Sequence, residues 1–195
     1  METVAAIRQA AVQLLSAPGG SRITTTEIAQ RAGVSVGTLY QYFPNKPALL
    51  QSILSEHLEH VISAIETACR EQRGQSLPVM VEALIDRFVD AKLYDSAVSV
   101  SLYAIADGLE AKPILRQQQV RARKAITALL LTVPGVRFPQ LETTVLMMYS
   151  SMAGTMRAVL EAGAGKTLVE ATRREMKLMV EGHLTRASIA TKRSA

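Results

Sequence analysis

The segment from residue 24 to residue 46 concentrates the side chains best suited to contact another molecule. The chain has only five tyrosines and three phenylalanines, yet Tyr40, Tyr42 and Phe43 fall within four positions, and hydroxyl residues surround them. Hydroxyl and ammonium groups near helix starts bind phosphate oxygens, and short side chains in a groove contact base edges. Phe43 follows Leu39 by four residues and is expected to face the core instead. The pattern favours recognition of a nucleic acid.

The rest of the chain contains no recognised catalytic arrangement. It has no glycine-rich phosphate loop, no nucleophile elbow and no HExxH sequence. Residues 163–167 resemble the end of a phosphate-binding loop, but position 160 is Leu where the loop needs its first glycine, and no strand is predicted before it. We therefore expect a protein that is not an enzyme and binds no cofactor.

The histidines and the single cysteine do not form a metal-binding pattern. His57 and His60 lie three residues apart near Glu56 and Glu59, but no third ligand follows at a recognised spacing. We expect no metal site. A single cysteine forms no internal disulfide, so Cys69 is expected to be a small buried hydrophobe, with redox sensing as the alternative.

Helical periodicity dominates the chain, and no segment shows sustained strand alternation. Thr24 and Glu27 are spaced as in a capping box, Ser35 is placed to cap the next helix, and Pro44 ends that helix. We predict an all-α fold of about nine helices. Their approximate ranges are 5–17, 25–32, 36–43, 46–73, 78 to beyond 88, 96–107, 113–133, 140–162 and 166–187.

Residues 31–35 connect two short helices as in a helix-turn-helix. Ala29 and Ala32 are small enough for a close approach of the two helices, Gly33 can adopt a positive φ, and Val34 is placed to fill the gap. Such a unit presents its second helix to the major groove of DNA. The alternative is an ordinary helical hairpin inside a bundle.

Residues 24–50 resemble the DNA-binding domain of the tetracycline-repressor (TetR) family. The resemblance rests on the Thr-rich cap, the Ala-Gly-Val-Ser turn, Gly-Thr-Leu-Tyr, the aromatic pair before Pro, and the Lys that opens a long helix. It implies two domains: a helix-turn-helix domain over 1–46, with the turn at about 32–35 and the recognition helix at about 36–42, and an effector-binding and dimerisation domain over 47–190. The polar composition of residues 191–195 predicts a flexible tail.

The resemblance also implies the DNA contacts. Two threonines at the start of the second helix contact phosphates or base edges, three residues of the recognition helix face the bases, and two tyrosines and a lysine bind phosphates. These are Thr25 and Thr26; Val36, Gly37 and Thr38; and Tyr40, Tyr42 and Lys46. The recognition helix contains no Arg or Lys, so a bidentate contact to guanine is not expected from it.

The charge of the chain suits a polyanion without identifying one. The formal net charge is +5, and the sequence pI is about 9.6. Only residues 1–4 precede the first predicted helix, so we expect no minor-groove contact from a basic arm. The expected sources of positive charge in this region are Arg8, Arg22 and Lys46. The mild charge supports one alternative, a helical interaction module that has lost DNA binding.

The last two helices are predicted to form a dimer through a four-helix bundle, because a unit of this type reads half of a site. The alternative is that they form an internal core pair. The predicted interface consists of Met152, Gly154, Met156, Met176, Met179 and His183. The family resemblance further implies an effector pocket, for which the candidates are Phe88, Tyr94, Leu102, Tyr103, Met147 and Met148. Each candidate fits a plain core position equally well.

These observations together predict a homodimeric, ligand-responsive repressor that binds a palindromic double-stranded DNA operator and is released by a small apolar or amphipathic effector. An activator or a non-transcriptional DNA-binding regulator of the same fold are alternatives. No apolar run reaches the roughly 18–20 residues of a membrane span, and the first residues lack the layout of a signal peptide. We expect a cytoplasmic protein with no membrane partner.

Overall fold

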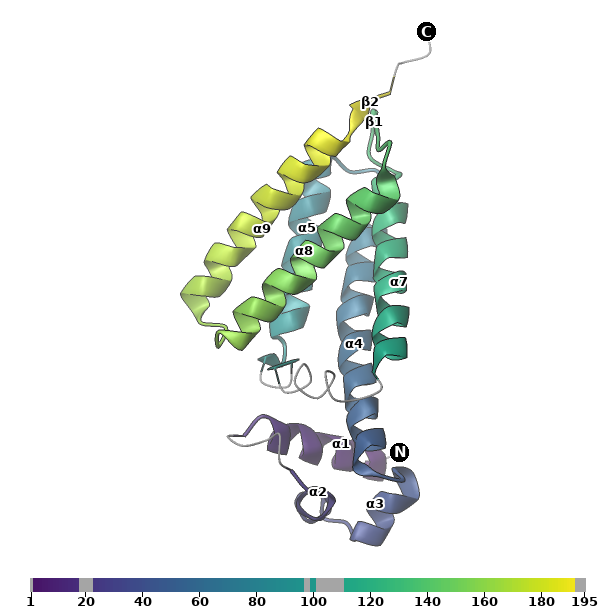
Figure 1. Ribbon diagram of the computed structural model, residues 1–195, viewed down its shortest axis with the longest axis vertical. Coiled ribbons are helices and arrows are strands. Elements are labelled where there is room, and N and C mark those ends of the chain that lie inside the picture. Colours follow the sequence, from purple (N-terminus) through teal and green to yellow (C-terminus); the bar gives the residue numbers. More distant parts are fainter. Residues whose placement is uncertain (1, 18–22, 97–98, 101–110, 192–195) are drawn as a thin grey trace. The chain divides into compact units, whose positions relative to one another are not determined.

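The computed structural model describes residues 2–17, 23–96, 99–100 and 111–191. Within these ranges the chain forms eight α-helices and one antiparallel pair of two-residue strands, which confirms the all-α prediction (Figure 1). The expected helix over 96–107 falls largely outside the described residues. The helices are α1 (Glu2–Leu15), α2 (Thr25–Ala32), α3 (Val36–Tyr42), α4 (Lys46–Glu71), α5 (Leu77–Leu93), α7 (Lys112–Leu130), α8 (Leu141–Glu161) and α9 (Lys166–Ala187).

The chain divides into two compact units. One consists of Met1–Leu58 with Asp95–Leu115, and the other of Glu59–Tyr94 with Arg116–Ala195. Helix α4 therefore contributes its first half to one unit and its second half to the other. The predicted boundary after residue 46 lies at the first residue of α4, and the functional division that it implies stays a prediction.

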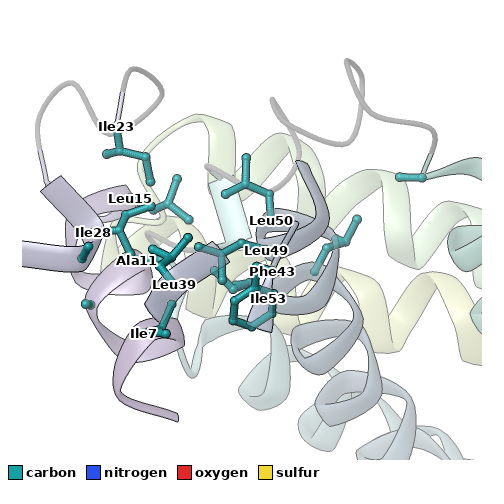
Figure 2. Packing of buried hydrophobic residues seen from close by; sticks show 14 residues of the cluster. Ile7, Ala11, Leu15, Ile23, Ile28, Leu39, Phe43, Leu49, Leu50 and Ile53 are labelled. Atoms are coloured by element: carbon teal, nitrogen blue, oxygen red, sulfur yellow. The ribbon is translucent and has the colours of Figure 1, made fainter. Parts of the chain in front are cut away.

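A hydrophobic core holds the helix-turn-helix in the first unit. Helices α1, α2, α3 and the beginning of α4 each turn apolar side chains into one cluster (Figure 2). Leu39 is fully buried and Phe43 is 7% exposed, so the inward orientation predicted for Phe43 is confirmed. The other members drawn and labelled are Ile7, Ala11, Leu15, Ile23, Ile28, Leu49, Leu50 and Ile53. Because α3 has only seven residues, this packing, rather than helix propensity, fixes its orientation.

The second unit is a helical bundle whose helices are joined by charged side chains. Helices α8 and α9 run side by side in opposite directions, and α9 also packs against α5 (Figure 1). On α9, Arg173 contacts Asp86 of α5 at 3.0 Å, and Lys177 contacts the same carboxylate at 2.9 Å. Burial by itself would raise the pKa of Asp86, but the hydrogen bonds from Lys177 and Arg173 lower it overall. The carboxylate is therefore charged at neutral pH and links α5 to α9.

A second charged cluster joins α7 to the later part of α4. The guanidinium Nη2 of Arg121 lies 3.0 Å from Oε1 of Glu59 and 2.8 Å from Oε2 of Glu66. The hydrogen bond from Arg121 lowers the pKa of Glu59 to about 2. One arginine thus bridges two carboxylates that lie seven positions apart on one face of α4.

The two strands connect segments that are far apart in the sequence. Strand β1 (Val136–Arg137) precedes α8, strand β2 (Ile189–Ala190) follows α9, and Val136 pairs with Ala190. The Thr191 N–H also donates to the Gly135 carbonyl at 3.0 Å. The sequence did not predict this pairing, because two residues are too few to show strand alternation.

Helix α7 ends at Leu130, three residues before the predicted end. The next residues form a turn in which the Thr132 hydroxyl donates to the Leu129 carbonyl at 2.6 Å and accepts from the Gly74 N–H at 3.0 Å. Thr132 thereby joins the turn after α7 to the turn after α4. Among the described helices, none combines the length and the apolar character that crossing a bilayer requires.

Candidate functional site

The start of α2 has the predicted capping box. The Glu27 N–H donates to the Thr24 hydroxyl at 3.2 Å, and the Thr24 N–H and hydroxyl donate to the Glu27 carboxylate at 2.7 Å and 2.8 Å. The hydrogen bond from the Thr24 hydroxyl has the largest effect in lowering the pKa of Glu27, and the bond from the Thr24 N–H lowers it further. Two of the otherwise unpaired N–H groups at the helix start are satisfied, and the first residue of α2 is held in place.

The turn between α2 and α3 depends on a left-handed glycine. Gly33 has φ 68° and ψ 28°, a conformation that L side chains rarely adopt. Its N–H donates to the carbonyls of Ala29 and Gln30, and the Val34 N–H donates to the Ala29 carbonyl at 3.0 Å. The half-buried Val34 packs against the hydrophobic core. The positive φ and the filling role predicted from sequence are both confirmed.

Helix α3 begins after the predicted serine cap and ends at Tyr42, one residue before the end of the predicted helix over 36–43. The Ser35 hydroxyl accepts from the Thr38 N–H at 2.9 Å, and the hydroxyls of the same two residues are 2.9 Å apart. Phe43 adopts an extended conformation directly after the helix, immediately before Pro44. The cap and the proline therefore limit α3 to seven residues, a length suited to one pass through a groove.

The structure places the candidate DNA contacts on the outside of this unit. Tyr40 is 46% exposed and Tyr42 is 49% exposed. Thr26 and Gly37 are also exposed, whereas Thr25, Val36, Thr38 and Lys46 are half-buried. The hydroxyls of Thr25 and Tyr40 lie 3.2 Å apart and join the two helices. The predicted set is thus distributed over α2, α3 and the first residue of α4.

The expected sources of positive charge differ in their availability. Arg8 forms an ion pair with Glu56 at 3.4 Å, and Arg31 donates to the Gln13 side chain at 2.9 Å. Arg22 lies outside the described residues. Of the predicted cations, Arg8 therefore has a partner within the chain, whereas no hydrogen bond or ion pair involves the Lys46 ammonium group among the described residues.

Three of the predicted dimer-interface residues are core residues instead. Met152, Met156 and Met176 are each exposed by 2% or less within a single chain. The face of α8 that carries Met152 and Met156 therefore packs inside the second unit. Periodicity shows that a helix has an apolar face but not whether its own chain or a partner covers that face.

The other three predicted interface residues reach the surface. Gly154 is exposed, Met179 is 44% exposed and His183 is half-buried. A shallow hollow of about 120 Å³ between α8 and α9 is lined by Met147, Met148, Ser151, Met179, Val180 and His183. The Nε2 atom of His183 is buried and has no hydrogen-bond partner among the described residues.

The candidate effector residues do not come together in this hollow. Met147 and Met148 line it, but Phe88 is 1% exposed and is not among the lining residues. Tyr94 is 80% exposed, with its ring 4.8 Å from that of His60. Leu102 and Tyr103 lie outside the described residues. The predicted pocket as a whole therefore stays a prediction.

Cys69 and His57 have ordinary structural roles. Burial raises the pKa of the Cys69 thiol to about 12, so the thiol is protonated at neutral pH and is a poor nucleophile. His57 Nε2 lies 3.1 Å from the Ser99 hydroxyl. A search of the described residues finds no group of three His, Cys, Asp or Glu side chains arranged to hold a metal ion.

Comparison with known families identifies this arrangement. Residues 7–53 match the family described as bacterial regulatory proteins, tetR family. Residues 76–184 match the tetracyclin repressor-like C-terminal domain, and this second match alone spans more than half of the 195 residues. The chain belongs to the TetR family. Its N-terminal part is the helix-turn-helix DNA-binding domain of a bacterial regulatory protein, and the resemblance noted in residues 24–50 is confirmed.

Individual TetR-family relatives share parts of the sequence or the fold. The nucleoid occlusion factor SlmA of Marinobacter nauticus is 36% identical over 66 residues, which are 34% of this chain and 34% of SlmA. The match thus spans about one third of the length of that relative. A tetR-family regulatory protein from Rhodococcus RHA1 has a TM-score of 0.72 at 20% identity, covering 98% of this chain and 100% of that one. The regulator FadR from Bacillus subtilis, in complex with stearoyl-CoA, has a TM-score of 0.70 at 18% identity, covering 92% of this chain and 98% of FadR.

Gln41 is an exposed residue of α3 that is absent from the predicted DNA contacts. Gln41 follows the buried Leu39 by two positions, which places it on the opposite side of the helix. The sequence pattern that indicates Gln41 is a polar side chain two positions after a predicted core residue.

Proposed function

We propose that this chain is a homodimeric repressor that binds a palindromic operator and is released by a small apolar or amphipathic effector. The observation that carries the proposal is the outer surface of α3, where Gly37, Tyr40 and Tyr42 are exposed while Leu39 holds the inner side of the helix in the core. A rigidly held helix with exposed polar groups suits the major groove. Repression by blocking a promoter needs no catalysis, and the proposed place of action is the cytoplasm.

The proposed contacts divide into two classes. The hydroxyls of Thr25, Tyr40 and Tyr42 and the ammonium group of Lys46 bind phosphates and fix the position of the domain on the duplex. Thr26, at the start of α2, contacts a phosphate or a base edge. Val36, Gly37 and Thr38 approach the bases, where methyl groups of valine and threonine suit the thymine methyl. Their exposed or half-buried positions support this division.

The proposed dimer uses the outer faces of α8 and α9. Met147 is 55% exposed and Met179 is 44% exposed, and both line the hollow next to the unpaired His183 Nε2. A second copy covering this surface would remove two apolar side chains from water. Two helix-turn-helix units would then bind successive major grooves about 34 Å apart.

The proposed effector response is a shift between two conformations of the dimer. An effector that binds the DNA-incompetent conformation more tightly lowers operator affinity, by no more than its differential affinity allows. The apolar character proposed for the effector is supported by the similarly folded FadR, whose solved structure contains stearoyl-CoA. The proposed pocket consists of Phe88, Tyr94, Leu102, Tyr103, Met147 and Met148.

The proposal is tested by titrating the protein against duplexes from the region that flanks its own gene, at several salt concentrations. We expect tight binding to one duplex, a negative slope of log affinity against log salt, and a rise in the downstream transcript when the gene is deleted. Equal affinity for that duplex and for a shuffled duplex of the same composition would contradict sequence-specific binding and favour an interaction module. A fall in the transcript would indicate an activator.

The similarity to SlmA favours one further candidate, a DNA-binding role outside transcription. Mapping the bound sites along the chromosome separates the two functions. Sites confined to promoters support the repressor, whereas sites scattered through coding regions, with no transcript changed by deletion, support the second candidate.

A further inference from the structure

The outward face of α3 is defined by two residues. With about 100° of rotation per helical residue, positions two before and two after Leu39 point roughly 160° away from it. These positions are Gly37 and Gln41, and both are exposed while Leu39 is fully buried. They are four residues apart and therefore neighbours on the helix surface. They form the part of α3 that meets the floor of a groove if Leu39 faces the core.

Gly37 is not required by the fold. It does not have the positive φ that requires glycine at position 33. A Cβ atom built on it would approach only the Ser35 hydroxyl, at an ordinary 3.6 Å. Glycine inside a helix is destabilising relative to alanine. The bare backbone at this position therefore leaves space for something outside the chain, directly beside Gln41.

The Gln41 amide has no partner, unlike the hydroxyls of Thr38 and Tyr40 on the same helix. The Thr38 hydroxyl is 2.9 Å from that of Ser35, and the Tyr40 hydroxyl is 3.2 Å from that of Thr25. Within the described part of the chain no hydrogen bond involves the Gln41 side chain. Both the amide N–H donor and the carbonyl acceptor are therefore available to a ligand.

We propose that Gln41 is a specificity-determining residue that reads one adenine in each half of the operator. Gln41 Nε2 donates to adenine N7, and adenine N6 donates to Gln41 Oε1. Guanine presents two acceptors at these positions and would leave Oε1 facing a like group, while cytosine and thymine each offer only one matching atom. The proposal rests on the proposed function, because it requires that α3 enter the major groove.

The test begins with selection of binding sites from a pool of duplexes with a randomised core, carried out with the wild-type chain and with Gln41→Ala. We expect the wild type to select an adenine at one symmetric pair of positions, and Gln41→Ala to lose that preference alone. Affinity should fall by about 5- to 100-fold for each half-site contact that is lost, the range of one bidentate contact. Gln119→Ala, which removes an exposed glutamine from α7, is the matched control and should change nothing.

Two further measurements identify the contact at the level of atoms. Replacing the selected adenine by 7-deazaadenine removes the N7 acceptor without affecting base pairing, and it should weaken the wild type but not Gln41→Ala. Gln41→Glu keeps the size of the side chain but loses its donor, so the preference at that position should move from adenine to cytosine, whose N4 donates to a carboxylate.

The possible outcomes separate this proposal from the one on which it rests. If the wild type selects no sequence at all, both the DNA-reading function and the role of Gln41 are wrong. A selected site that Gln41→Ala binds with unchanged preference overturns the role of Gln41 alone. A uniform loss of affinity for all sequences would overturn it too, because that result identifies a phosphate contact.

Discussion

The hydroxyl oxygens of Thr25 and Tyr40 lie 3.2 Å apart, although the two residues are 15 positions apart in the sequence. This hydrogen bond joins the first residue of α2 to the exposed side of α3. The Tyr40 hydroxyl is thereby held at a defined position relative to the N–H groups at the start of α2 before any ligand binds. Preorganisation of this kind reduces the conformational entropy lost on binding.

Loss of the Tyr40 hydroxyl should weaken binding to every DNA sequence alike. For Tyr40→Phe we expect affinity to fall by about tenfold for selected and random duplexes, because a hydrogen bond to a charged phosphate is lost. Thr25→Val combined with Tyr40→Phe should cost less than the sum of the two single changes, since the residues share one hydrogen bond. Fluorescence anisotropy with both duplexes measures this. A change in sequence preference would show that Tyr40 contacts a base.

Lys46→Ala provides the contrast, because it removes a charge. Because the proposed dimer carries two copies of Lys46, its slope of log affinity against log salt should become shallower by about 2, whereas the slope of Tyr40→Phe should equal that of the wild type.

Gly37→Ala should affect stability and DNA binding in opposite directions. The fold accommodates a Cβ at this position, so replacing a helical glycine should stabilise the chain by about 0.5–1 kcal/mol. Affinity for the operator should nevertheless fall, because the methyl group occupies space at the proposed interface. Urea unfolding and DNA titration of the same preparation test both effects. Unchanged affinity would show that DNA does not approach position 37.

The ion cluster of α4 and α7 should make the free energy of unfolding depend on pH. The pKa of Glu59 is lowered from 4.5 to about 2 in the folded chain, so its stabilising effect is present above about pH 4.5 and disappears as the pH falls toward 2. Arg121→Gln should lower the free energy of unfolding by about 1 kcal/mol at pH 7, since these side chains are partly solvated. The difference from wild type should vanish near pH 2.

Urea unfolding at several pH values measures this dependence. Lys124→Gln is the matched control, because it removes a positive charge from the same helix and no ion pair involves it among the described residues. A pH-independent effect of Arg121→Gln would mean that its packing, not its charge, stabilises the bundle.

Gly154→Arg should convert the proposed dimer into monomers. Gly154 follows Ser151 by three residues on α8 and so continues the surface that lines the hollow. A Cβ at this position meets nothing within 4 Å, so a single chain tolerates a larger residue, whereas a close partner helix would not. Sedimentation velocity gives the mass. Val120→Arg, at a 56% exposed position on α7, is the control and should leave the mass unchanged. A Gly154→Arg variant that remains dimeric would show that this face is not the dimer interface.

Local features of the fold could be predicted from the sequence, whereas features that depend on distant segments could not. The caps formed by Thr24 and Ser35 and the turn at Gly33 depend on residues within four positions of each other, and all were predicted. The bridge from Arg121 to Glu59 joins residues 62 positions apart. Periodicity alone does not reveal such a pair, because it describes one helix at a time.

The same distinction explains the outcome for the candidate sites. The proposed recognition residues Gly37 and Tyr40 lie on one short helix, whose inner side was identifiable from Leu39 and Phe43. The interface prediction was wrong for Met152 because a stripe that packs inside one chain and a stripe that packs between two chains have the same spacing.

The pairing of Val136 with Ala190 has a consequence for the surface of α8 and α9. The short connection over residues 162–165 joins the two helices at one end, and the strand pair joins their other ends, so the helices form a closed loop. Because α8 and α9 are connected at both ends, they have little freedom to separate or to slide past each other. The strand pair therefore restrains the relative movement of the two helices whose side chains line the hollow at Met147 and Met179.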